Sequence, residues 1–504
     1  MARKKIYTIN RFDGGITDKL RSGDYTKCAH VSHFDIYQDP NRLIPLPGYV
    51  DDMHDGSTST GMKQYGLQGF WATNGYLYAV GRKSDNTGTK FFSKDSATSA
   101  SWSAMSNGEG TDDLASNTFL VSTDQGGNFF VVTNAGTSTY LARYQNSVGV
   151  TDKYNTMQTA LTSLPHIVEF AFDTNYYYNT GFTDVGKISG TTITDPSKST
   201  GGYVTDVCSG DEQIGIMQYR FYPYKAQLLL WDSASLLADQ KVEFGDGRES
   251  ALGNVSGVWV AAVANNLVSS AINDEYANGE YSLDIKYLGE GGAKTLTRFF
   301  AATNTNGALL PIRSRYRDCM LFYARIPQDA TPTTYKEGIW AVGRSREDSP
   351  MAVSLLLDTG SLGSIEGFYS HGKHSHFAHG GDGSISRLDD LSSGTYDVDG
   401  EYHSLFFGSD TPNLKQLNGV GILTEDLPNG ASVTLYYRFD ENDSWSSFGT
   451  SSTEGSEKHQ FTKVSGVSIG GFREIQFKIV VSGKVIIKNI IVSISELDDI
   501  GFSI

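Results

Sequence analysis

The chain has 504 residues, more than one small domain needs, which indicates two or three domains. Hydrophobic residues, aromatic ones included, make up 39% of the chain. This fraction is low for a soluble domain, and the difference is made up by Gly (55 residues), Ser and Thr rather than by charged residues. The 28 Tyr, 26 Phe and 6 Trp exclude a disordered chain, because segments that bury little surface are poor in aromatic residues. The glycine content excludes a mainly helical protein and favours short strands separated by many turns.

Charge is unevenly distributed along the chain. The formal net charge is −16, from 57 acidic and 41 basic side chains. Residues 1–50 hold eight basic and five acidic side chains, so this head carries +3 and residues 51–504 carry −19. An acidic body disfavours general affinity for nucleic acid or for anionic membranes.

The cysteines Cys28, Cys208 and Cys319 are widely spaced and form no CxxC pair. This pattern argues against a disulfide framework and against a cysteine zinc site, and it indicates synthesis in a reducing compartment. The basic start of the chain is not followed by an apolar segment, and no run of about 18 apolar residues occurs. We therefore expect neither a signal peptide nor a membrane anchor.

Short apolar runs of strand length, bounded by Gly, Asn, Asp or Ser, recur through the middle of the chain. They are residues 75–81, 128–133, 167–172, 226–231, 258–263, 318–323 and 338–342. One anchor for each presumed unit (Leu77, Val131, Tyr177, Leu229, Val263, Phe322 and Phe377) gives a mean step of about 50 residues. That period fits four-stranded blades, so we predict a β-propeller. A β-sandwich or a solenoid array remains an alternative, because neither a WD dipeptide nor a kelch double glycine repeats.

The two ends differ from the middle. In residues 1–60, Pro40, Pro45 and Pro47 exclude a regular helix and a central strand, which predicts an extended strap. Residues 401–504 alternate strands and tight turns, including a predicted hairpin of 472–481 and 485–494, and indicate a small β-sandwich. The predicted all-β architecture is thus a strap (1–60), a β-propeller (61–400) and a C-terminal β-sandwich (401–504). Short helices are expected only at 152–164 and 233–242.

Stretches at both ends resemble a known family. They are Phe12-Asp-Gly-Gly-Ile-Thr17, His33-Phe-Asp-Ile-Tyr37, Arg42-Leu-Ile-Pro-Leu-Pro-Gly48, Val433-Thr-Leu-Tyr-Tyr-Arg438 and Phe472-Arg-Glu-Ile-Gln-Phe477. Together with a propeller-like middle, they resemble the tail nozzle protein of short-tailed bacteriophages and, less closely, the hub or ring proteins of longer tails. Arg42 and His33 stand where the family pattern has Gly and Asn.

The resemblance implies a structural protein of the virion that forms a ring of six copies, carries other tail proteins and conducts viral DNA without binding it specifically. Six copies carry a formal charge of −96, and an acidic wall repels phosphate and lets DNA slide. The basic head is then expected to dock on an acidic neighbour. Two alternatives stay open: a receptor-binding tail protein that recognises a host glycan, and a glycan-degrading propeller enzyme.

One cluster carries candidate metal chemistry. Four histidines lie within residues 371–379, and His374 and His376 are two apart, which places both on one face of a strand. The resemblance adds that some phage tail tips bind iron through His-x-His strands at a trimer axis. The alternative is an exposed histidine-rich strand without metal.

The remaining motifs predict no catalysis. Residues 93–102 approach the Asp-box turn of sialidase propellers, which is a folding device. Acidic turns at 382–385, 397–400 and 440–443 lack the spacing of a calcium loop. Since HExxH and phosphate-loop patterns are absent from the sequence, we predict no enzyme activity and no cofactor.

Overall fold

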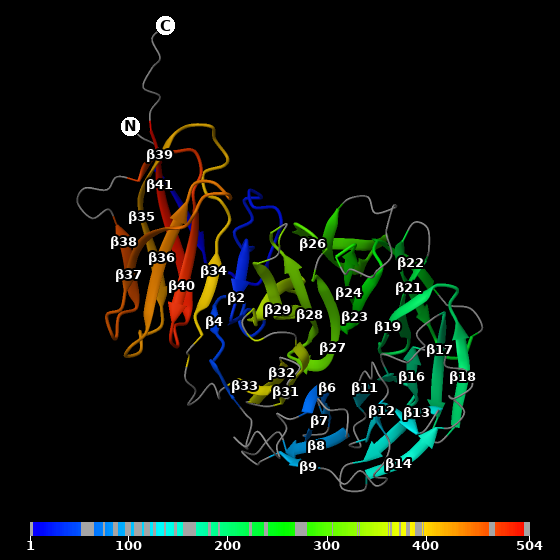
Figure 1. Ribbon diagram of the computed structural model, residues 1–504. Coiled ribbons are helices and arrows are strands. Elements are labelled where there is room, and N and C mark those ends of the chain that lie inside the picture. The colour runs from blue at the N-terminus through cyan, green and yellow to red at the C-terminus, as the bar shows by residue number, and fades with distance from the viewer. Residues whose placement is uncertain are drawn as a thin grey trace. The chain divides into compact units, whose positions relative to one another are not determined.

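The computed structural model describes most of the chain. The described residues are 4–51, 65–73, 76–83, 89–95, 102–104, 113–114, 121–123, 128–135, 138–145, 149–154, 168–179, 183–189, 192–220, 224–235, 240–267, 280–304, 306–329, 331, 333–360, 362, 365–371, 374–379, 384–388, 396, 398–462 and 469–497. These residues form 41 strands and no helix. The all-β prediction is therefore confirmed (Figure 1). Accordingly, no helix in this part of the chain is long and apolar enough to cross a membrane.

The chain divides into two compact units. The propeller unit comprises residues 50–339 and 359–388. The sandwich unit comprises residues 1–49, 340–358 and 389–504. The domain boundaries predicted from sequence stay a prediction, and the compact units add that the strap and the C-terminal residues belong together.

The propeller unit contains seven sheets among its described residues, most of them four-stranded antiparallel meanders. Blade 1 is β6 (Tyr65–Thr73), β7 (Tyr76–Lys83), β8 (Thr89–Asp95) and β9 (Ser103–Ala104). Blade 2 is β10 (Asp113–Leu114), β11 (Val121–Thr123), β12 (Asn128–Ala135), β13 (Ser138–Gln145) and β14 (Gly149–Tyr154). Blade 3 is β15 (Val168–Phe170), β16 (Tyr176–Asn179), β17 (Asp184–Ser189) and β18 (Thr192–Ser199).

The later blades repeat this pattern. Blade 4 is β19 (Tyr203–Ser209), β20 (Ile214–Arg220), β21 (Lys225–Trp231) and β22 (Gln240–Asp246). Blade 5 is β23 (Glu249–Val255), β24 (Val258–Asn265), β25 (Tyr281–Gly289) and β26 (Gly292–Ala301). Blade 6 is β27 (Ala308–Tyr316), β28 (Cys319–Pro327) and β29 (Tyr335–Gly343), and the chain leaves the propeller unit within β29. Blade 7 is β31 (Ile365–His371), β32 (His374–His379), β33 (Ser384–Leu388) and the earlier strand β5 (Tyr49–Asp51).

One inner strand from each blade takes part in a closed ring. Contacts run in order from β6 to β11, β15, β19, β23, β27 and β31, and β31 in turn contacts β6. Closure is reinforced in blade 7, where β5 from early in the chain forms the outermost strand beside β33. The predicted β-propeller is therefore confirmed, and its described sheets form seven blades.

Successive blades pack face to face through apolar side chains. In β21 of blade 4, Leu228 and Leu230 point to a core shared with Trp259 of blade 5. The alternate residues Leu229 and Trp231 point to the opposite core, shared with blade 3. Because both faces of each blade are covered, the strand sequence is a continuous apolar run rather than an alternation.

The sandwich unit consists of two main sheets. One contains β30 (Ala352–Asp358), β2 (His30–Ser32), β34 (Gly400–His403), β40 (Gln476–Ser482), β36 (Ser432–Arg438) and β37 (Ser446–Ser451) in that order. The other contains β1 (Lys4–Ile9), β41 (Ile487–Glu496), β35 (Lys415–Thr424) and β38 (Lys458–Thr462), with β39 (Gly470–Phe472) also paired to β35. A short hairpin of β3 (Phe34–Asp35) and β4 (Ile44–Pro45) completes the strap.

Two local predictions are wrong. The predicted hairpin of 472–481 and 485–494 does not form, because β40 and β41 lie in different sheets. Each strand alternates buried and more exposed residues, so each needs one covered face, and two sheets supply it from opposite sides of one core. The predicted helices also fail where the structure describes them, since 152–154 belong to β14 and 240–242 to β22. The rest of 152–164 lies outside the described residues.

Candidate binding pocket at the propeller mouth

A pocket of about 580 Å³ lies where the inner strands of blades 3, 4, 5 and 6 end. Its lining comes from the turns that join the first and second strands of these blades, at 171–175, 210–213, 256–257 and 317–318, together with the adjoining strand ends. Because the strands that precede these turns, β15, β19, β23 and β27, are consecutive members of the ring, the four turns lie next to one another around part of its axis. Pockets at the mouths of such rings are common ligand sites.

The turn of blade 3 is held by one carboxylate. Asp173 accepts hydrogen bonds from the backbone N–H of Asn175 (3.3 Å) and from the hydroxyl of Tyr177 (2.7 Å), and the Lys187 amine lies 3.5 Å away. Burial acts to raise the pKa of Asp173, but the hydrogen bonds from Tyr177 and Asn175 outweigh it and leave that pKa below its usual value. This turn therefore presents the 39% exposed side chain of Phe172 from a fixed backbone.

Polar contacts join neighbouring turns around the pocket. The backbone N–H of Phe172 in blade 3 donates to Oγ of Ser209 in blade 4 (3.2 Å), and the Ser209 N–H donates to the Glu169 carboxylate (3.4 Å). Between blades 5 and 6, the Ser256 hydroxyl donates to the carboxylate of Asp318. The pocket is thus built from turns that hold one another in place.

Close packing links blade 4 to blade 5 at the same level. A Cβ added to Gly210 would lie 2.7 Å from the Trp259 ring and 3.1 Å from the Asn254 amide, so only glycine fits there. Asn254 in turn accepts a hydrogen bond from the Gly257 N–H (2.9 Å). A side chain at position 210 would push these two blades apart.

Several turns around the pocket have an unusual backbone. Thr174, Ser256 and Arg317 have φ values of 62°, 46° and 54°, in the left-handed region that few residues other than glycine adopt. Ser256 and Gly257, both with positive φ, form a two-residue hairpin turn between Val255 and Val258, as the twist of paired strands favours. Such conformations persist where the surroundings fix them, and they often mark binding sites.

The pocket combines acceptors, donors and aromatic surface. Glu169, Asp211 and Asp318 supply carboxylates, Arg317 supplies a guanidinium group, and Phe172 supplies an exposed ring. This composition suits a polar ligand that offers hydroxyl groups together with some apolar surface. These residues were not predicted from the sequence: Phe172 and Asp318 stand at the ends of the runs predicted as strands at 167–172 and 318–323. The two-residue turn Ser256-Gly257, directly before the strand predicted at 258–263, is visible in the sequence.

The predicted metal ligands lie elsewhere in the propeller. Both belong to β32 of blade 7, where His371 pairs with His374 and Tyr369 with His376. The side chain of His376 is buried, being 1% exposed, whereas the side chain of His374 is not among those described. The metal prediction for His374 and His376 therefore stays a prediction, which elemental analysis of the purified protein tests. Elsewhere in the described ranges, no group of three or more His, Cys, Asp or Glu is placed to hold a metal.

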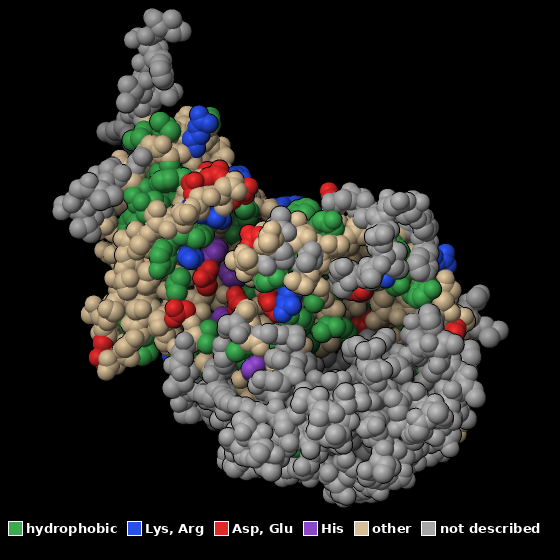
Figure 2. Space-filling view, in the orientation of Figure 1, with side chains coloured by type: hydrophobic (Ala, Val, Ile, Leu, Met, Phe, Trp, Pro, Cys, Tyr) green, Lys and Arg blue, Asp and Glu red, His purple; other side chains and the backbone are tan. Residues whose placement is uncertain are grey.

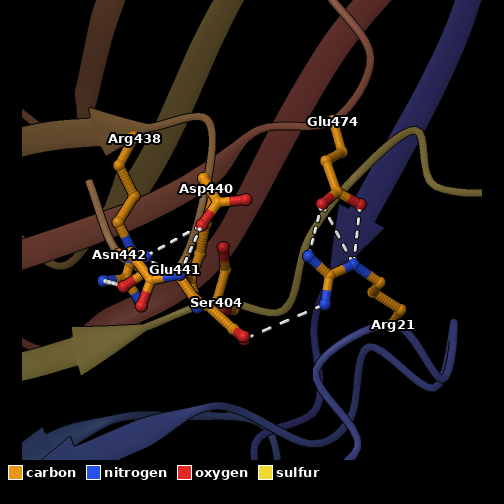
Figure 3. A network of polar contacts seen from close by, with 8 residues as sticks. Arg21, Ser404, Arg438, Asp440, Glu441, Asn442 and Glu474 are labelled. Carbon is orange, nitrogen blue, oxygen red and sulfur yellow. Dashed lines mark hydrogen bonds and ion pairs between the residues drawn. The ribbon is translucent and has the colours of Figure 1, made fainter.

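The other sequence motifs have local roles where they are described. In the turn 440–443, Asp440 accepts a hydrogen bond from the Asn442 N–H (3.0 Å), and Asp443 accepts one from the Asp440 N–H (3.0 Å). These bonds stabilise an exposed turn (Figure 3). The Asp-box-like stretch lies largely outside the described residues, as do 382–383 and Asp397 of the other acidic turns. The three cysteines form no disulfide.

Basic side chains of the head pair with acids of their own unit. Arg21 forms a two-pronged contact with Glu474, in which Nε donates to Oε2 (2.9 Å) and a terminal guanidinium nitrogen donates to Oε1 (2.5 Å) (Figure 3). Lys5 pairs with Asp410, and Arg42 lies 2.8 Å from Glu425. Figure 2 shows red and blue side chains close together on the sandwich unit. Part of the +3 charge of the head is therefore neutralised within the chain.

Comparisons with known proteins bear only on general architecture. No protein-family description and no curated protein matches the chain. Among solved structures, the Pan2 WD40 domain of Neurospora crassa is similar at 10% identity and a TM-score of 0.39, covering 71% of this chain and 98% of that one. YCF48 bound to a D1 peptide is similar at 7% identity and a TM-score of 0.40, covering 69% and 99%. The exo-beta-1,3-galactanase of Phanerochaete chrysosporium is similar at 7% identity and a TM-score of 0.28, covering 90% and 100%. At these scores nothing about activity transfers, and the propeller assignment rests on the chain's own ring of sheets.

Proposed function

We propose that the protein is a structural component of a bacteriophage tail that assembles into a ring, carries other tail proteins and lets viral DNA pass. The role is mechanical rather than enzymatic, and it places the protein in the virion. The proposal starts from the stretches at both ends that resemble tail nozzle proteins. It extends to six copies for the ring, as that family implies.

The strongest support for the proposal is that the stretches at the two ends of the chain belong to one compact unit. The stretches with family resemblance lie more than 380 residues apart in sequence, yet they belong to one compact unit. β1 pairs with β41 along its whole length, and β2 pairs with β34. The motif residues Phe12, Ile16 and Phe34 are all at least 96% buried. A sequence pattern shared by two distant segments is expected when both contribute to one core, so the resemblance has a structural reason.

The negative charge of residues 51–504 also supports the proposal. The body of the chain carries −19, and acidic walls do not retain DNA. We expect acidic side chains to be concentrated on the surface that faces the ring axis. Because Lys5, Arg21 and Arg42 are paired within the unit, docking on an acidic neighbour falls to basic residues such as the exposed Lys4 and Lys19.

Particle imaging gives the direct test. Virions labelled through an antibody to this chain, imaged by electron cryomicroscopy, should show six copies around the tail axis. Label absent from the tail, or present as a single copy, would overturn the proposal. A second test replaces Lys4 and Lys19 with Gln, which leaves strand pairing intact, and counts assembled tails. Asp18→Asn, in the same exposed strap, is the control for general effects of charge removal.

A further inference from the structure

We propose that the pocket at the propeller mouth is a binding site for a neutral oligosaccharide. The inference rests on the pocket alone and does not depend on the tail assignment. It adds a recognition function to a chain whose other proposed role is mechanical. The pocket has an aromatic surface, a mixture of polar groups and rigid turns.

The aromatic surface comes from Phe172. Its side chain is 39% exposed and sits in the turn between β15 and β16, although most aromatic side chains with described burial in this unit lie inside or between blades. An exposed aromatic ring at the edge of a polar pocket offers a flat apolar face to a ligand. Sugar rings present such a face through their C–H groups, while their hydroxyl groups point outward.

The polar groups favour a neutral ligand over a charged one. Three carboxylates, from Glu169, Asp211 and Asp318, accept hydrogen bonds, and Arg317 donates them. An anionic ligand would meet three carboxylates, and a cationic ligand, which offers only donors, would give Arg317 no acceptor. Hydroxyl groups both donate and accept, so a polyhydroxylated ligand pairs with every one of these side chains. Asp211, Arg317 and Asp318 are exposed, so their charges stay in contact with water.

The rigidity of the turns lowers the entropic cost of binding. Contacts between blades, from Phe172 to Ser209 and from Ser256 to Asp318, hold the turns together without a ligand. Because these turns are already ordered, a ligand that spans several blades binds with little loss of conformational entropy in the turns. The volume of about 580 Å³ lies within the usual range of small-ligand sites and accommodates a short oligosaccharide.

The test uses the purified full-length chain on an array of neutral oligosaccharides built from glucose, galactose, mannose and N-acetylglucosamine. The best binder is then titrated by calorimetry against two pocket variants, Phe172→Ala and Asp211→Asn. We expect at least one array member to bind, and each variant to weaken it by about tenfold. Neither side chain is buried, so the variants should fold.

Matched controls separate site effects from general ones. Phe300→Ala removes another exposed phenylalanine, 59% exposed on β26, and Asp246→Asn removes an exposed aspartate at the end of β22; neither residue lines the pocket. Both controls should bind as the wild type does. Failure of every array member to bind, or equal weakening by the controls, would overturn the proposal. So would preferential binding of a tri-arginine peptide that is lost at 0.5 M salt, about the range in which exposed ion pairs are screened, because that outcome assigns the pocket to cations.

Discussion

The carboxylate of Asp206 in blade 4 accepts a hydrogen bond from the backbone N–H of Leu252 in blade 5, at an N···O distance of 2.6 Å. Its other oxygen accepts the N–H of Val207 in its own strand (2.8 Å), next to a register shift in β19. Asp206 is fully buried. One side chain therefore satisfies the backbone of a bulge and joins two blades near the ring axis.

Replacing Asp206 should weaken the propeller. Asp206→Ala leaves two buried N–H groups without their acceptor, at a cost of about 1–3 kcal/mol for each. Asp206→Asn retains one acceptor oxygen and should cost less. Urea unfolding followed by tryptophan fluorescence measures both. The control Asp246→Asn removes an exposed ion pair with Lys225 in the same blade and should change the unfolding free energy by less than about 1 kcal/mol.

Glu249, at the start of β23, should make stability depend on pH. Burial raises its pKa to about 7, and the positive charge of the nearby Arg248 only partly opposes this shift. The unfolded chain loses this proton near the ordinary value of 4.5, so the folded state is penalised as pH rises from 4.5 to 7. Glu249→Gln should therefore stabilise the protein by about 1–3 kcal/mol at pH 8 and have little effect at pH 4.5.

Denaturant titrations of wild type and Glu249→Gln at the two pH values test this prediction. Glu243→Gln is the matched control, since Glu243 is exposed and lies 3.4 Å from Lys225. An equal gain at both pH values would show that Glu249 is not titrating in the folded protein.

The repeat was predictable from sequence because buried strands are apolar on both faces. All seven anchors fall in different blades. The step from Leu229 to Val263 is only 34 residues because Leu229 lies in the third strand of blade 4, while the neighbouring anchors Tyr177 and Val263 lie in second strands. Met217, in the second strand of that blade, would have given steps of 40 and 46.

The pocket and the sandwich topology could not be predicted from this apolar pattern. Apolar pattern identifies strands but not their neighbours, so the placement of β40 and β41 in different sheets is invisible in the sequence. Likewise, Phe172 and Asp318 fall at the ends of runs predicted as strands, and the sequence does not show that blades 3 and 6 bring them to one pocket. The information lies in long-range packing, which a single sequence does not display.

His33 should destabilise the sandwich unit in mild acid. Its side chain is 4% exposed, Nε2 accepts the N–H of Asp358 (3.3 Å), and burial lowers its pKa to about 4. The unfolded chain takes up this proton near pH 6.5, so stability falls as pH drops from 6.5 to 4, by up to about 3 kcal/mol. His33→Asn tolerates the positive φ of 57° and should flatten the decline between pH 7 and pH 4.5. An unchanged slope in urea titrations would contradict this.

Gly15, in the stretch 12–17 near the start of the chain, should be intolerant of any side chain. Its φ is +67°, and an added Cβ would lie 2.5 Å from the backbone nitrogen of Val353. Gly23 is a matched control, since its φ is +74° and an added Cβ would meet nothing within 4 Å. Gly23→Ala should cost about 1 kcal/mol from backbone conformation alone. Gly15→Ala adds a clash with backbone that cannot move without breaking the hydrogen bond from the Ile16 N–H to the Val353 carbonyl (2.8 Å), so its cost should exceed the control by at least about 2 kcal/mol. Thermal unfolding and limited proteolysis of the strap measure both variants, and equal losses would show that conformation, not close packing, explains the glycine.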